Sequence, residues 1–306
     1  MNPLRQAIIA DVVKQTGAHD EPHVFGGEPG DPGLTGPGTM SWEINGDIAS
    51  VLIGGIGAIV MEILHPSVMA GVQDLSNYRE QPERRGKTTF GYVVTTTFAN
   101  TKAATRLVNV VKRMHGQVEG TRPDGVPYRA LDPELIGWVH TCIPWAVMTA
   151  YERYNRPLTE AQKDRYLREQ AVIGRMGGAE VIPESCAELR DYVEEMRPRL
   201  AVNAQTLQFF EFLMEMPFGV KAPAALARPA HRFQVEAGMS ITPEWVRRMT
   251  GFHGSGATRP LHVPSLSSYA RAVRWAFGTP AYRRLAEERA GGLVRATAPR
   301  PVAAGT

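Results

Sequence analysis

The sequence is poor in cysteine. Its 306 residues include only two, Cys142 and Cys186. Two cysteines cannot form the disulfide framework of a small secreted domain, and neither belongs to a Cys-x-x-Cys pair that would indicate zinc, thiol redox chemistry or covalently attached haem. We therefore expect a protein of a reducing compartment, and the cytoplasm fits best.

A long uninterrupted apolar run is also missing. The longest run, Val51 to Leu64, contains Glu62 and is shorter than the roughly 20 residues that span a bilayer. Near the N-terminus, Asp11 and Lys14 follow a short apolar stretch, unlike the apolar region of a signal peptide. These features predict a soluble protein without a transmembrane segment or a secretion signal.

Several functional signatures are absent as well. The formal net charge is only +3 and the basic residues are scattered, so nucleic acid is not an expected partner. The glycines of GGIGAIVM do not have the spacing of a dinucleotide-binding loop, and there is no Walker motif. A G-x-S-x-G elbow and an H-E-x-x-H helix are also missing. The sequence therefore contains no motif for binding NAD or ATP and no signature of the common hydrolase mechanisms.

The chain does contain enough apolar residues, at helical spacing, to form a helical core. It is 43% hydrophobic and 21% charged, which is ordinary for a globular protein. Apolar residues recur at helical spacing and no alternating strand pattern stands out, so the fold class is predicted to be all-α. Helix starts are expected near Asn45 or Asp47, at Asp132-Pro133, at Thr159-Glu160 and after Ser185. Two further helices are expected between Lys87 and Gly120.

The predicted organisation has three parts. Residues 1–44 form an N-terminal segment and a Gly/Pro-rich loop, residues 45–295 a single helical domain, and residues 296–306 a disordered tail. Within the domain, residues 218–230 and 251–265 are expected to be loops, with short helices around 243–250 and 266–290. Gly54, Gly55 and Gly57 lie inside a predicted helix, which indicates close packing against a flat group or another backbone.

Polar residues on otherwise apolar helices are the candidates for chemistry. Arg84, Lys87 and Thr88 stand at i, i+3 and i+4, so in a helix they share one side. That side could be a cationic binding face or simply a solvated surface. The other candidates are a carboxylate and three histidines: Glu62, His65, His115 and His140.

Spacing alone leaves each histidine open to a second interpretation. His115 ends a Val/Met stripe and His140 follows Trp138 and Val139, as core histidines also do. His65 precedes Pro66 and could simply end a helix. No histidine pair has the spacing of a facial triad with an adjacent carboxylate. A single helix histidine that faces a large apolar cavity is what the proximal side of a haem iron requires.

Four segments in fixed order resemble one family. They are IGGIGAIVMEILHPSVMAGVQDLSNY, PERRGKTTF, VVKRMHGQVEG and GVPYRALDPELIGWVHTCIPWAVMTAYERY, and together they cover roughly residues 45 to 215. This succession is similar to the domain shared by latex-clearing proteins, which are rubber oxygenases, and the MpaB-type oxygenases. A fixed order of several motifs is more specific than any one of them.

The resemblance implies a globin-like helical core, with additional helices around non-covalent haem b. It implies that His115 is the axial iron ligand, with His140 and His65 as the other candidate cofactor-binding histidines. Arg84, Lys87 and Thr88 match the stretch on the opposite side of the haem, where the lysine can approach the iron and the arginine orients oxygen. Lys87 stands where many members have arginine, and Glu62 where they often have glutamine. A carboxylate there could be a base or an ion-pair partner.

The expected function is therefore haem-dependent oxidation of a lipophilic small molecule by dioxygen or peroxide, as a tailoring step in secondary metabolism. The alternative is a non-catalytic protein that binds or senses haem or an apolar ligand. A third possibility is a helical protein without iron whose histidines belong to the core. A homodimer is compatible with each of these interpretations.

Overall fold

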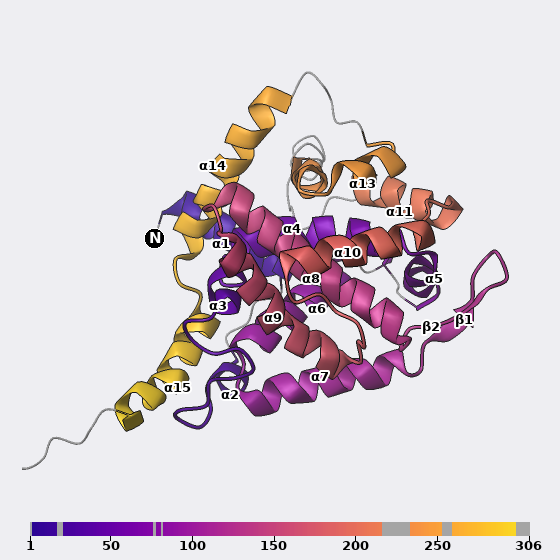
Figure 1. Ribbon diagram of the computed structural model, residues 1–306. Helices are drawn as coiled ribbons and strands as arrows, with labels where there is room; N and C mark the ends of the chain where they lie inside the picture. Colours follow the sequence, from indigo (N-terminus) through magenta and orange to yellow (C-terminus); the bar gives the residue numbers. More distant parts are fainter. Residues whose placement is uncertain are drawn as a thin grey trace, which may run out of the picture.

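The structure is a computed structural model that describes residues 2–16, 21–75, 78–80, 82–215, 233–252 and 259–297. This part of the chain is mostly helical (Figure 1), which confirms the predicted helical class. The helices of the first half are α1 (Pro3–Thr16), α2 (Pro22–Phe25), α3 (Met40–Ile44), α4 (Ile48–Glu62), α5 (Pro66–Leu75), α6 (Pro82–Phe98) and α7 (Thr101–His115). Those of the second half are α8 (Pro133–Tyr154), α9 (Glu160–Gly177), α10 (Cys186–Met196), the 3-10 turn Arg197–Arg199, α11 (Ala204–Glu215), α13 (Glu244–Met249), α14 (Arg259–Phe277) and α15 (Ala281–Thr297). Residues 233–240 are also helical.

Helices α4 and α8 form an antiparallel pair in the middle of the molecule (Figure 1). Near the middle of α4, Gly54 lies against the backbone of Val147. At the C-terminal end of α4, the indole of Trp138 donates to the carbonyl oxygen of Glu62 at 3.2 Å. Buried apolar residues of α8 belong to three hydrophobic clusters. The pair therefore holds the core together.

The glycine prediction is confirmed at two of three positions. A methyl group on Gly54 would stand 2.6 Å from the Cα of Val147, and one on Gly57 would stand 2.8 Å from Ile241. At Gly54 the contact is with backbone atoms that cannot turn aside, so only glycine allows this packing. At Gly57 the contact is with the end of the Ile241 side chain, and the carbonyl oxygen of Gly238 is 3.1 Å away. Gly55 differs, because a methyl group there would meet nothing within 4 Å. Open space therefore lies beside α4 at that residue.

The helix starts agree with the sequence, but one capping prediction was wrong. Thr159 forms a capping box with Gln162 at α9, and Asp132 caps α8 through the amide of Glu134. Asp47 precedes α4 without capping it. Its carboxylate instead accepts hydrogen bonds from Arg274 at 2.7 and 3.0 Å. A partly buried ion pair between α14 and the start of α4 takes the place of the cap. The side-chain amide of Asn45 donates to the hydroxyl of Thr97.

Other sequence expectations need correction. Strands β1 (Glu119–Thr121) and β2 (Pro127–Arg129) form an antiparallel hairpin in which Gly120 pairs with Tyr128, where we expected a helix to continue. A short helix, α2, interrupts the Gly/Pro-rich loop.

Towards the C-terminus, we predicted a loop over residues 251–265. The prediction is wrong from Arg259 onward, because α14 begins there. Residues 266–290, which we predicted as one helix, form parts of two helices, α14 and α15. The break between them begins at Gly278. Residues 218–230 lie outside the described residues, as does the predicted tail beyond Thr297.

Within the described residues, no single helix combines the length and apolarity needed to cross a membrane. Helices α4 and α5 meet that test only together, across a bend of 108°.

Candidate functional site

His115 and His140 lie close together. His115 is half-buried at the last residue of α7, and His140 is half-buried on α8. His140 also contacts Tyr92 of α6, with ring centroids 5.9 Å apart in an edge-on arrangement. Three helices that are separate in sequence thus contribute one aromatic side chain each to a cluster.

Helix α9 forms the floor beneath His140. A methyl group on Gly174 would stand 3.2 Å from the Cβ of His140, and one on Gly177 would stand 3.0 Å from its Nε2. Two glycines at i, i+3 on one face of α9 therefore allow the imidazole to pack directly on the helix backbone. The Nε2 atom of His140 is directed at α9.

The surroundings keep His140 neutral. Burial, and then the charge of the neighbouring His115, lowers the pKa of His140 to about 4. Two imidazoles side by side repel when both are protonated, and burial disfavours the charged form. At neutral pH His140 is therefore an uncharged imidazole beside His115.

His65 belongs to a different part of the fold. It lies between α4 and α5, is 5% exposed, and its Nδ1 accepts a hydrogen bond from the amide of Ser67 at 3.2 Å. Its Nε2 is 3.5 Å from the carboxylate of Glu134. Both ring nitrogens therefore have protein partners, and a polar pocket of about 470 Å³ that includes Arg122 and Arg199 lies next to the ring.

We expect His65 to make the protein less stable in acid. Burial lowers the pKa of His65 below its ordinary value of 6.5, although the charge of Glu134 opposes the shift. The unfolded chain then binds the proton more readily, so stability is highest above that value and falls as the pH drops below it. Replacing His65 with Gln should reduce the loss of unfolding free energy between pH 7.5 and 5.5. Glu134→Gln should increase it, and equal losses in both variants and the parent would contradict this assignment.

Glu62 is buried at the C-terminal end of α4, at 7% exposed. Burial and the charge of Glu62 raise the pKa of the Cys142 thiol, so the carboxylate lies near α8. The thiol is therefore protonated at neutral pH and is a poor nucleophile. Glu62 and Cys142 thus place a carboxylate beside an uncharged thiol in the core.

Arg84, Lys87 and Thr88 share one side of α6, as predicted. Arg84 and Thr88 are exposed and Lys87 is half-buried. The hydroxyl of Thr88 donates to the carbonyl oxygen of Arg84 at 2.9 Å, so it bonds within its own helix. One turn further on, Gly91 and Thr95 continue the same side and line a pocket.

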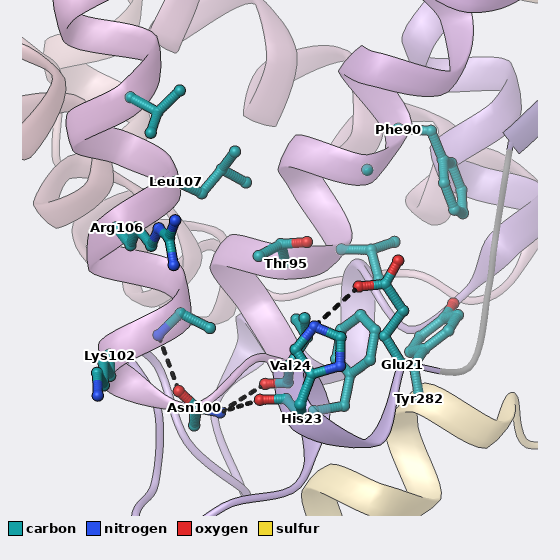
Figure 2. Close-up of a pocket in the computed structure, with 15 residues that line it drawn as sticks. Glu21, His23, Val24, Phe90, Thr95, Asn100, Lys102, Arg106, Leu107 and Tyr282 are labelled. Atoms are coloured by element: carbon teal, nitrogen blue, oxygen red, sulfur yellow. Dashed lines mark hydrogen bonds and ion pairs between the residues drawn. The ribbon is translucent and has the colours of Figure 1, made fainter.

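That pocket was not predicted from the sequence. It has a volume of about 560 Å³ and lies between α6 and α7, with α2 and α15 at one end (Figure 2). Asn100 holds the corner where the two helices meet. Its amide accepts a hydrogen bond from Ala103 and donates to carbonyl oxygens of α2. The one sequence signal for a hollow here is Gly91, a glycine within a helix.

Residues 42–275 match the family described as "ER-bound oxygenase mpaB/B'/Rubber oxygenase, catalytic domain". The match covers most of the chain and includes all seven of the predicted site residues. The chain belongs to this family of oxygenases. The resemblance inferred from the motifs is thereby confirmed.

The curated relatives of this MpaB/rubber-oxygenase family member carry no functional name. Uncharacterized protein Rv2237 of Mycobacterium tuberculosis and Uncharacterized protein Mb2261 of Mycobacterium bovis are each 28% identical to it over 130 residues. That stretch is 41% of this chain and 50% of each relative, so the chain spans about half the length of the curated relatives it matches. No solved structure matches the chain.

Proposed function

We propose that the protein is a haem-b-dependent oxygenase that acts on a lipophilic small molecule, and that His115 is the residue that would bind the iron. Membership of an oxygenase family is the observation that carries the proposal. The resemblance on which the haem assignment rests also implies a globin-like arrangement of the helices around it. The position of His115 supports the assignment, since its half-buried imidazole lies next to the uncharged imidazole of His140, which can orient it.

Two features of the described residues, an imidazole on α7 and open space beside α4, suit a haem. A haem needs one imidazole on the iron and apolar surroundings for a flat ring. His115 offers the imidazole, while open space lies beside Gly55 on α4. Ile59 and Ile143 are partly exposed on the two central helices. Bound haem would supply the redox chemistry with dioxygen or peroxide.

Contacts of the other two histidines favour His115 as the ligand. Both ring nitrogens of His65 already have protein partners. The Nε2 of His140 is directed at the α9 backbone. His140 instead stands where it can orient the ring of His115, which is the usual role of a polar neighbour of a metal ligand.

The remaining predicted residues would act on the oxidant and on protons. Lys87 and Arg84 would bring positive charge and N–H donors to one side of the site, which favours an anionic oxygen species. The hydroxyl of Thr88, which donates to the carbonyl oxygen of Arg84, would offer its lone pairs as an acceptor. Glu62 would hold a proton on its buried carboxylate and release it during turnover.

Haem uptake tests the proposal. The purified full chain, titrated with haem, is expected to give a saturable Soret band at one haem per chain. Oxygen consumption with a lipophilic alkene should then depend on Lys87, so Lys87→Ala should lower turnover while the Soret band persists. A chain that takes up no haem would refute the proposal, and haem uptake without any turnover would favour the carrier or sensor alternative.

A further inference from the structure

The pocket between α6 and α7 has an apolar body. Figure 2 shows Phe90 on one side and Leu107 on the other, with Thr95 between them. Val94 and Val110 add to the apolar lining. A volume of about 560 Å³ lies within the range of pockets that hold small organic ligands.

One wall of the pocket is cationic. Lys102 and Arg106 stand one turn apart on α7, and both side chains are exposed. Neither forms an ion pair within the described part of the chain. The acidic residue of the lining, Glu21, is 3.6 Å from the Nε2 of His23. The two cations therefore face the pocket without an acidic partner from the described residues.

This pocket is separate from the histidine cluster. An α-helix turns about 100° per residue, so His115 lies about 140° around α7 from Val110, which lines the pocket. The charge of His115 acts on His140 of α8, whereas Val110 lines the pocket together with residues of α6. The pocket also uses His23 and Tyr282, which lie outside the residues that match the oxygenase family.

We propose that the pocket binds a lipophilic carboxylate. The carboxylate would pair with Arg106 and Lys102, since a guanidinium offers two parallel N–H donors that match two oxygens. The alkyl body would pack against Phe90, Val94 and Leu107. Gly91 makes room for it, because a methyl group there would meet nothing within 4 Å. The proposal goes beyond the oxygenase function and rests on the pocket alone.

Calorimetry with a matched pair of probes tests the charge requirement. Dodecanoate, used below its micelle concentration, is expected to bind the full chain at least about tenfold more tightly than dodecan-1-ol, and added salt should reduce the difference. The double variant Lys102→Gln/Arg106→Gln should remove this preference. Arg113→Gln, an exposed charge elsewhere on α7, should keep it. Equal binding of the acid and the alcohol by the parent would overturn the proposal.

A second variant locates the binding site. Gly91→Leu should fill the hollow, since a Cβ atom there meets nothing within 4 Å, and should improve helix propensity, so the protein should stay folded and lose dodecanoate binding. Retained binding in this variant would also overturn the proposal. The measurements need no haem, and the Soret titration of the Lys102→Gln/Arg106→Gln variant should match the parent. A chain that fails to bind haem but binds dodecanoate would thus refute only the oxygenase proposal.

Discussion

Replacing His115 with alanine is expected to weaken haem binding by about a hundredfold or more and to shift or remove the Soret band. The reason is that the iron would lose the bond that His115 supplies, while the apolar contacts of the ring would remain. His115 is half-buried at the end of α7, so its removal should leave the fold intact. A haem titration followed at the Soret band, with circular dichroism as the check on folding, measures the effect.

Two other histidines provide the controls. His65→Gln should leave haem binding unchanged, because His65 is engaged by Ser67 and Glu134 away from the cluster. His140→Gln should weaken binding by roughly ten- to a hundredfold, as loss of a neighbour that orients a metal ligand does. If His115→Ala keeps the parent spectrum and His140→Gln loses it, the ligand is His140 and our assignment is wrong.

Much of the helical framework could be predicted because its signals are local. Asp132-Pro133 and Thr159 start helices through contacts within their own first turns, and such contacts are visible in the sequence. Asp47 shows where prediction from local patterns ends. Its carboxylate binds Arg274, a residue too far along the chain for any local pattern to reveal.

The sequence analysis missed helix α5 and the β-hairpin for identifiable reasons. Helix α5 starts at Pro66, where we expected only an end. Proline suits the first turn of a new helix as well as it stops an old one. The strands of the hairpin are too short to show an alternating pattern of apolar and polar residues. The sequence signal for the hairpin is the turn at Asp124-Gly125, where Gly125 has a φ of 83°. Turn residues would have been better evidence there than apolar periodicity.

The candidate site was predicted only in part. Ordered motifs pointed to His115 and His140, but only the fold shows that they are neighbours, since α7 and α8 are separated by the hairpin. The α6–α7 pocket needs side chains from α2 and α15 as well. A pocket assembled from such distant segments leaves no continuous pattern in the sequence.

Gly54→Ala and Gly55→Ala are expected to have opposite effects on stability. Both replacements gain up to about 1 kcal/mol in helix propensity. On Gly54 the new methyl group would stand 2.6 Å from the Cα of Val147 and 2.9 Å from its backbone nitrogen. Because backbone atoms cannot turn aside as a side chain can, α4 and α8 must separate along the core. We expect a net loss of about 2 to 3 kcal/mol.

Gly55 is the matched control in the same turn. Its methyl group would meet nothing within 4 Å, so the gain in propensity should appear as a small stabilisation. Urea unfolding of the haem-free chain, compared at constant slope, measures both effects. Similar midpoints for the two variants would contradict direct backbone contact between α4 and α8. If Gly55→Ala then weakens haem binding without loss of stability, the open side of α4 lies against the cofactor.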